Sequence, residues 1–439
     1  MRNLLKSILG IHPESSCILH GWQKLPVRIS GDLDIVVTRE NLPLLQRRLR
    51  DADGARLVNV LQHESTCYYF VLAISNGAGW RYLPVDAAAD YRRDARIWFR
   101  APELLTGARR GKGFSIAAPE VEFGYLLLKK ILKEELPAHG AERLSELARE
   151  LGAEAEGIAV RLLGKEVGRR IVTSLRAGNW RPDRQELARL KRLARRRRLQ
   201  EDPFNAVRYW LPELGRIWRR WCHPTGLWVA VLGADGAGKS TVLGEIERGL
   251  TGAFRRSRTL HLLPGVLRRT GAEGPVTDPH GTPPRSALVS LAKLLLYGLD
   301  CATGYLIKIR PAAVRSTLVL FDRYYHDLLV DPRRYRYGGP MWLARLVGRL
   351  LPKPDLFILL DLPAEVAHAR KPEVELEEAR RLRQRYLELA RELGAHVVDA
   401  SRPLEEVVRE CEEIVLTFME ERTRRRLRRL FPEAFGAER

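Results

Sequence analysis

Cysteine is scarce in this sequence, which argues against folds held together by disulfides or zinc. The sequence also shows no export signal, which argues against a secreted protein. Five cysteines lie far apart in 439 residues, with neither a C-x-x-C pair nor the Cys/His spacing of a zinc site. Disulfide-stapled and zinc-stabilised folds are therefore excluded, and a reducing, cytoplasmic compartment is expected. Near the amino terminus His12, Pro13 and Glu14 interrupt the apolar residues before a signal-peptide core is complete, so no export is expected.

Long uncharged apolar runs are also lacking. The longest apolar stretch, residues 287–309, contains Lys293, Asp300 and Lys308, and a charge near the centre of a bilayer costs at least ~2.5 kcal/mol. We therefore expect a long amphipathic core helix there, not a membrane span. Hydrophobic residues make up 45% and charged residues 29% of the chain, which excludes a largely disordered protein.

Basic residues outnumber acidic ones, 75 against 54, and the net charge of +21 favours nucleotides, nucleic acid or an acidic membrane surface as partners. The charge alone does not choose among them. Two arginine runs, residues 195–198 and 424–429, are expected to be solvated helix faces, with phosphate or anionic-lipid contact as the alternative. Residues 209–221 combine aromatic and cationic side chains, as interfacial helices do, but packing of the tryptophans between two domains is the favoured interpretation.

Changes in hydrophobic period divide the chain into three parts. Residues 1–117 contain strand-like segments and one helix-like segment, which predicts a small α+β domain. Residues 118–224 have helical spacing and are expected to form a helical extension and linker. Residues 225–439 alternate apolar strands with helices, which is typical of a parallel α/β sheet with helices on both faces. The expected strands of this sheet are residues 227–232, 260–263, 317–321, 356–360 and 396–398.

The strongest motif is a phosphate-binding loop. Residues 233–241, Gly-Ala-Asp-Gly-Ala-Gly-Lys-Ser-Thr, fit the pattern G-x-x-x-x-G-K-[ST] between an expected strand and an expected helix. Backbone N–H groups of such a loop cradle phosphates, the lysine reaches the β- and γ-phosphates of ATP, and the serine ligates Mg²⁺. The predicted nucleotide-binding residues are Gly233, Asp235, Gly236, Ala237, Gly238, Lys239, Ser240 and Thr241. Lys239 is also a predicted catalytic residue.

A second apolar strand ends in an acid. Asp322 follows residues 317–321 and emerges at the carboxyl edge of the expected sheet, beside the phosphate loop, with Arg323 next in the chain. Phosphoryl transfer depends chiefly on positioning and electrostatics. We therefore predict that Asp322 is a metal ligand and that Arg323 holds an anionic acceptor or the transferred group, which makes both residues catalytic.

Several segments resemble thymidylate kinases, in the same order along the chain, over about residues 226–418. The segments are residues 234–241, 321–324, 354–366, 385–390 and 398–407. The resemblance implies a P-loop kinase fold that transfers the γ-phosphoryl group of ATP, with Mg²⁺, to a nucleoside monophosphate such as dTMP. It also implies that Asp235 contacts the acceptor sugar or the reacting phosphates and that Asp322 and Arg323 organise the acceptor phosphate and the metal. A lid that includes Arg370 would close over ATP.

Two departures from the family pattern leave the acceptor open. Asp300 and Cys301 fall where the family usually has an arginine that reads the base, and neither donates hydrogen bonds as arginine does. The lid segment, residues 371–378, is shorter and more acidic than the family's lid. The alternatives are a sugar-related kinase of surface-polysaccharide synthesis and a nucleic-acid end-processing protein with kinase and nucleotidyltransferase domains.

The amino-terminal part resembles the DNA polymerase beta-like nucleotidyltransferases over about residues 15–130. The resemblance rests on a glycine followed by Asp32 and Asp34, whose carboxylates lie on one face of a strand, and on Asp86, which ends another strand. It implies that the three acids share Mg²⁺ ions for nucleotidyl transfer. Trp22 stands where that superfamily has a small residue, so a degenerate site is the alternative.

Overall fold

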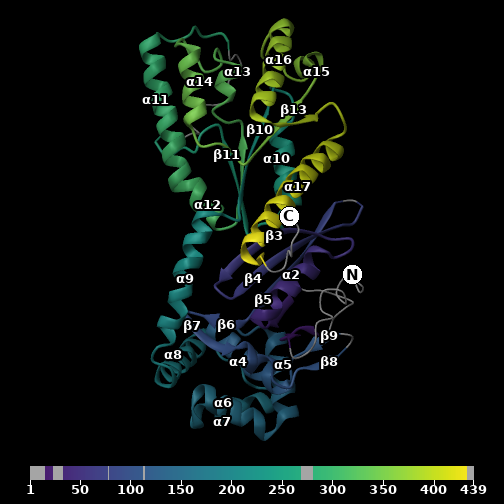
Figure 1. Ribbon diagram of the computed structural model, residues 1–439, viewed down its shortest axis with the longest axis vertical. Coiled ribbons are helices and arrows are strands. Elements are labelled where there is room, and N and C mark those ends of the chain that lie inside the picture. The colour runs from purple at the N-terminus through teal and green to yellow at the C-terminus, as the bar shows by residue number, and fades with distance from the viewer. Residues whose placement is uncertain (1–14, 23–32, 78, 112–113, 268–279, 433–439) are drawn as a thin grey trace. The chain divides into compact units, whose positions relative to one another are not determined.

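The computed structural model describes residues 15–22, 33–77, 79–111, 114–267 and 280–432 (Figure 1). The chain forms two compact units. The amino-terminal unit takes the described residues of 1–74, 83–218 and 423–439, and the carboxyl-terminal unit takes those of 75–82 and 219–422. The carboxyl-terminal unit is described first, because it contains the phosphate-binding loop.

A five-stranded sheet forms the centre of the carboxyl-terminal unit. Its strands are β10 (Leu227–Gly233), β11 (Arg256–His261), β12 (Thr317–Asp322), β13 (Leu356–Asp361) and β14 (His396–Asp399). They lie in the order β11-β12-β10-β13-β14, and every neighbouring pair is parallel. The uninterrupted apolar strands β10, β12 and β13 are buried along their length, as parallel strands covered on both faces are. The predicted parallel sheet is confirmed.

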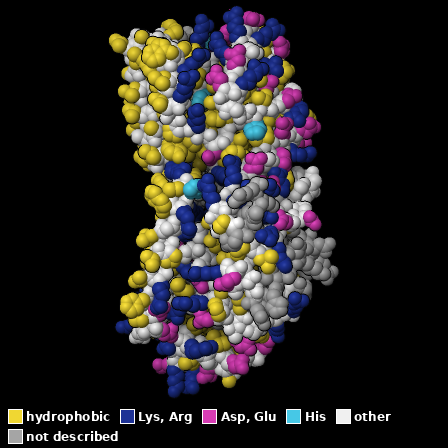
Figure 2. Space-filling view, in the orientation of Figure 1, with side chains coloured by type: hydrophobic (Ala, Val, Ile, Leu, Met, Phe, Trp, Pro, Cys, Tyr) yellow, Lys and Arg dark blue, Asp and Glu magenta, His cyan; other side chains and the backbone are white. Residues whose placement is uncertain are grey.

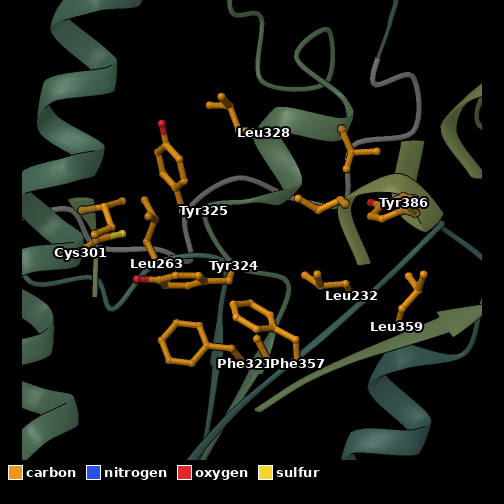
Figure 3. Packing of buried hydrophobic residues seen from close by; sticks show 14 of the residues in the cluster. Leu232, Leu263, Cys301, Phe321, Tyr324, Tyr325, Leu328, Phe357, Leu359 and Tyr386 are labelled. Carbon is orange, nitrogen blue, oxygen red and sulfur yellow. The ribbon is translucent and has the colours of Figure 1, made fainter. Parts of the chain in front are cut away.

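Helices cover this sheet and fill its connections. They are α10 (Lys239–Gly249), α11 (Ala287–Gly304), the π-helix η3 (Tyr305–Ile309), α12 (Arg310–Val314), α13 (Asp327–Val330), α14 (Met341–Leu350), α15 (Ala364–Arg370), α16 (Leu376–Leu393) and α17 (Leu404–Leu430). One face of the sheet, with Phe321 and Phe357, packs on side chains of α11 and α16 such as Cys301 and Tyr386 (Figure 3). Val229 points the other way and is equally buried, so the opposite face is covered as well.

The prediction of a core helix at residues 287–309 needs a correction, because the helix is present but much of its apolar surface is exposed. Helix α11 contributes Leu294 and Cys301 to the core, but Leu288 is 81% exposed, and Leu295 and Leu306 are also exposed. Residues 287–314 are long and apolar enough to cross a membrane by length and composition, and only 28% of their most apolar window is buried. Apolar composition predicted the helix, but it did not show which of its faces finds a partner in the fold.

The amino-terminal unit contains a seven-stranded mixed sheet in the order β3-β4-β5-β2-β1-β9-β8 and a separate hairpin of β6 and β7. The strands are β1 (Ser16–Ile18), β2 (Leu33–Val37), β3 (Arg56–Glu64), β4 (Cys67–Ser75), β5 (Trp80–Ala88), β6 (Asp90–Arg93), β7 (Arg96–Arg100), β8 (Arg109–Gly111) and β9 (Phe114–Ile116). Strand β3 was missed from the sequence, because its second half is polar and half-exposed.

Helices complete the amino-terminal unit. They are the short 3-10 helix η2 (Arg39–Asn41), α2 (Leu42–Arg50), α3 (Ala101–Leu105), α4 (Pro119–Lys133), α5 (Ala138–Leu151), α6 (Ala153–Leu163), α7 (Lys165–Arg176), α8 (Arg184–Glu201) and α9 (Asn205–Cys222), whose last residues enter the other unit. Leucines spaced at three and four residues along α4 and α5 form one core with α6, α7 and α8.

Glu64 gives this unit a predicted pH dependence. Burial raises the pKa of Glu64 from 4.5 to about 7, although the hydrogen bond from the Tyr209 hydroxyl acts in the opposite direction. An acid with a raised folded pKa costs stability once its unfolded form is ionised. The free energy of unfolding should therefore fall between pH 4.5 and pH 7, by about 3 kcal/mol, and stay level above pH 7.

Urea denaturation across this range tests the prediction by comparing Glu64→Gln with the wild type. Glu64→Gln should lose this component of the pH dependence, because its amide does not titrate. Glu40→Gln, which changes an exposed acid of the same unit, should keep it. Parallel pH profiles for the wild type and Glu64→Gln would contradict the prediction.

Candidate active site

The phosphate-binding loop leaves the sheet between β10 and α10. Strand β10 lies between β12 and β13, so the loop emerges where the strand order reverses, the usual ligand crevice of a parallel sheet. Gly236 and Gly238 have φ angles of +83° and +78°, a left-handed backbone that glycine adopts at little cost. These two glycines turn the chain from the strand into the amino terminus of α10, where Lys239 begins the helix.

Lys239 is buried and folded back on the loop. Its Nζ donates to the carbonyl oxygens of Gly233 at 3.0 Å and of Ala234 at 2.8 Å. Burial, with the nearby charge of Arg323, lowers the pKa of Lys239 to about 8. The ammonium is therefore held at the mouth of the loop, within reach of a phosphate that the loop would cradle.

Ser240 and Asp322 meet as a pair of oxygen donors. Ser240 Oγ donates to Asp322 Oδ2 at 3.1 Å, which joins the first turn of α10 to the end of β12. Asp322 Oδ1 is buried and has no hydrogen-bond partner among the residues that the structure describes. Burial alone would raise the pKa of Asp322, but His261 and Lys239 lower it overall, so the carboxylate is ionised. These hard oxygen ligands fit Mg²⁺, which takes few protein ligands and completes its shell with water and phosphate.

Arg323 connects the loop acid to a buried acid. Its guanidinium pairs with Asp235 and, through NH1, with Asp327 Oδ2 at 2.6 Å. Arg334 pairs with the other oxygen of Asp235. Burial would raise the pKa of Asp235, but Arg323, Lys239 and Arg334 hold it well below its usual range. Arg323 also has a φ of +68°, an uncommon backbone conformation for a residue with a side chain.

Several residues of this cluster were missed from the sequence. Asp327 is fully buried and accepts hydrogen bonds from Tyr386 at 2.5 Å and Tyr335 at 2.7 Å, besides the pair with Arg323. Arg334 belongs to a run of arginines and tyrosines, residues 333–337, and that run was the available signal. Asp327 follows Arg323 by four residues, a spacing that also places the two side chains together.

The acidic segment after α15 lies against the same cluster. Arg370 NH1 is 3.4 Å from the Gly236 carbonyl oxygen, beside the phosphate-binding loop where a nucleotide-binding cation was expected. Glu373 forms ion pairs with Lys371 at 2.5 Å and with Arg334 at 3.4 Å. A pocket between this segment and the loop is lined by Asp235, Arg323, Arg334, Lys371, Glu373 and Tyr386, among others.

Asp300 is committed to a structural role. Its carboxylate accepts the backbone N–H groups of Gly265 at 2.9 Å, Val266 at 2.7 Å and Leu267 at 2.6 Å. Lys308, further along the same helical segment, donates to the carbonyl oxygens of Pro264 and Gly265. Cys301 is buried in the core. Neither Asp300 nor Cys301 is therefore presented to a base.

The acids of the amino-terminal unit are held by other side chains. Asp34 pairs in register with Asp86 across β2 and β5, and Asp34 Oδ2 accepts from Lys129 at 2.7 Å and lies 2.8 Å from His20 Nε2. Cys67 Sγ donates to Asp86 Oδ1 at 3.0 Å.

These contacts bear on the predicted metal site of this unit. Asp32 lies outside the described residues. Among the described residues, no group of three His, Cys, Asp or Glu side chains is placed to hold a metal. Trp22 packs against the core of the unit. Nucleotidyltransferase chemistry here stays a prediction.

The family model and the relatives that this chain matches agree on one family. Residues 284–411 match the family model described as thymidylate kinase. The chain is similar to a probable thymidylate kinase of Pyrobaculum aerophilum, at 30% identity over 200 residues that cover 43% of this chain and 95% of the relative. It is also similar to the thymidylate kinase of Leifsonia xyli, at 36% identity over 210 residues that cover 42% of this chain and 92% of the relative.

Proposed function

Because the chain belongs to the thymidylate kinase family and is an ATP-dependent kinase, we propose that it transfers the γ-phosphoryl group of ATP to a nucleoside monophosphate, with dTMP as the first candidate. The observation that carries the proposal is the convergence of Lys239, the Ser240–Asp322 pair and Arg323 at the carboxyl ends of β10 and β12. We further propose that the enzyme works in the cytoplasm, where its five free cysteines stay reduced.

The donor side of the reaction uses the loop. Its backbone N–H groups would cradle the phosphates of ATP, and the Lys239 ammonium would leave the carbonyl oxygens of Gly233 and Ala234 for the phosphate oxygens. Ser240 and Asp322 would hold Mg²⁺, which neutralises the charge that develops on the phosphates during transfer. Asp322 Oδ1, which is buried without a hydrogen-bond partner among the described residues, supports this assignment.

On the acceptor side the proposal uses Arg323 and Arg334, which form ion pairs with Asp235 in this structure. Guanidinium groups bind phosphate through paired hydrogen bonds, so Arg323 and Arg334 would orient the acceptor phosphate towards the donor. Asp327 holds Arg323 in place from behind. The base of the acceptor would have to be recognised by residues other than Asp300 and Cys301.

An acceptor panel tests the proposal. Purified protein with ATP and Mg²⁺ should phosphorylate dTMP with kcat/KM about tenfold or more above other nucleoside monophosphates, because one well-placed polar contact discriminates by that factor or more. The measurement is ADP release in a coupled assay, with product identified by mass spectrometry. Turnover confined to phosphorylated sugars would contradict the nucleotide assignment while keeping the kinase.

A further inference from the structure

Helix α9 turns its polar side chains towards the fold. Asn205, Tyr209 and Glu213 are buried, with Glu213 only 1% exposed. Asn205 Oδ1 accepts the backbone N–H of Ile97 at 2.9 Å, and Tyr209 donates to Glu64 at 3.2 Å. The helix is therefore attached to the amino-terminal unit through hydrogen bonds and ion pairs instead of an apolar stripe.

The opposite side of α9 is apolar and exposed. Leu211 is 74% exposed and Trp218 is 69% exposed. With Phe204, which directly precedes the helix, the exposed apolar residues are Phe204, Val207, Trp210, Leu211, Leu214, Ile217, Trp218 and Trp221. Spacings of three and four residues place them on one stripe. A helix at a water-facing surface normally has the reverse arrangement, so this stripe, the outer face of α9, is built to meet an apolar phase. Packing of these tryptophans between the domains stays a prediction.

Within α9 itself, the exposed charges beside the outer face are of one sign. Glu213 is the one acid in the sequence of α9, and it is buried. Arg208 and Arg219 are exposed, and Arg208 also pairs with Asp202, which precedes the helix. An apolar stripe with tryptophans and flanked by arginines, without an exposed acid, is the composition of a helix that lies in the interface of an anionic membrane.

The carboxyl-terminal unit independently repeats this composition. Figure 2 shows hydrophobic side chains gathered over α11 and α14, as well as over α9. The exposed apolar residues of α11, η3 and α14 are Leu288, Val289, Leu295, Leu296, Leu299, Leu306, Ile307, Trp342, Leu346 and Leu350. The one acid of these three elements is Asp300, which is buried, whereas Arg345 and Arg349 of α14 are exposed. Two separate surfaces therefore combine apolar side chains with positive charge.

We propose that the outer face of α9 seats this kinase on the surface of a bilayer that contains anionic phospholipid. A bilayer accepts apolar side chains without matching their shapes, and the indoles of Trp210 and Trp218 suit its interface. The exposed Arg219 would pair with lipid phosphates, and Arg208 would do so by leaving Asp202. The buried polar side of α9 stays attached to the fold, so the helix lies on the membrane and does not cross it. The proposal does not depend on the identity of the acceptor.

Vesicle co-sedimentation of the full chain tests the proposal. Wild-type protein should bind vesicles of phosphatidylcholine with phosphatidylglycerol, bind vesicles of phosphatidylcholine alone more weakly, and lose binding as salt rises. The double variant Leu211→Glu with Trp218→Glu should lower the partition constant by about tenfold or more. The matched control is Leu44→Glu with Val397→Glu, which places two acids at exposed apolar positions outside α9, α11 and α14 and should bind as the wild type does.

Two further measurements separate the alternatives. Brominated phosphatidylcholine in the anionic vesicles should quench tryptophan fluorescence less in Trp218→Phe than in the wild type, because Trp218 would be inserted. Light scattering after gel filtration reports oligomeric state. Absence of wild-type binding to anionic vesicles, or equal binding by the α9 double variant, would overturn the proposal. So would a dimer that the double variant dissociates without any change in vesicle binding, because a second copy would then cover this face.

Discussion

Replacing Lys239 with alanine is expected to lower kcat for phosphoryl transfer by about 10³-fold or more. The ammonium sits at the mouth of the loop and is held there by two carbonyl oxygens, 2.8 Å and 3.0 Å away. The alanine variant has no group that can follow the charge as it moves onto the transferred phosphate. Single-turnover kinetics with ATP and the preferred acceptor would measure the loss.

Two comparisons make this expectation specific. Lys353→Ala, which removes an exposed lysine from the same unit, should keep full activity. Lys239→Arg should recover only part of the rate, because the planar guanidinium does not match the position of a point charge. Unchanged turnover in Lys239→Ala would mean that the phosphate-binding loop is not the site of the chemistry.

Replacing Arg323 with methionine is expected to destabilise the carboxyl-terminal unit by about 3–5 kcal/mol, the usual cost of stranding a buried charge. The Asp327 carboxylate would lose its charged partner, because Arg323 NH1 lies 2.6 Å from it. Water cannot take the place of that partner, since none of the Asp327 surface reaches solvent. The hydrogen bonds from Tyr386 and Tyr335 remain, but they do not neutralise the carboxylate. Urea denaturation would measure the change.

A double-mutant cycle separates the pair from its surroundings. Asp327→Asn should recover much of the stability lost in Arg323→Met, because the buried group is then neutral. The double variant should nevertheless stay inactive towards the acceptor, since the guanidinium proposed to bind its phosphate is gone. Arg381→Met changes an exposed arginine and should leave both stability and activity unaltered. Equal destabilisation in the double variant and in Arg323→Met would contradict the explanation.

Local pattern was enough to predict the donor side of the site. Apolar runs predicted β10 and β12, and the motif predicted that a helix follows the loop. The sequence pattern did not predict which side chains form ion pairs or hydrogen bonds with one another in the site. Arg334 reaches Asp235 from the irregular segment between α13 and α14, whose path no hydrophobic period specifies.

The same limit explains the errors on exposed helices. Helical periodicity identified the apolar residues near Leu295, and composition suggested that they were core. Burial depends on what packs against a helix, and a sequence pattern does not contain that information. In α9 the buried side is the polar one, with Glu213 at its centre, so the polarity of the residues did not indicate which side packs.

The carboxylate of Asp300 has a consequence for how substrate preference can change in descent. The resemblance implies that a base-reading arginine would fall near this position, yet here Asp300 accepts three backbone N–H groups of residues 265–267. An arginine there would leave those donors unsatisfied and add a cation near Lys308, which holds the same segment. No single substitution at residue 300 therefore restores that mode of base recognition. The backbone of residues 264–267 would have to change with it, so a substitution at residue 300 is tied to the conformation of that segment.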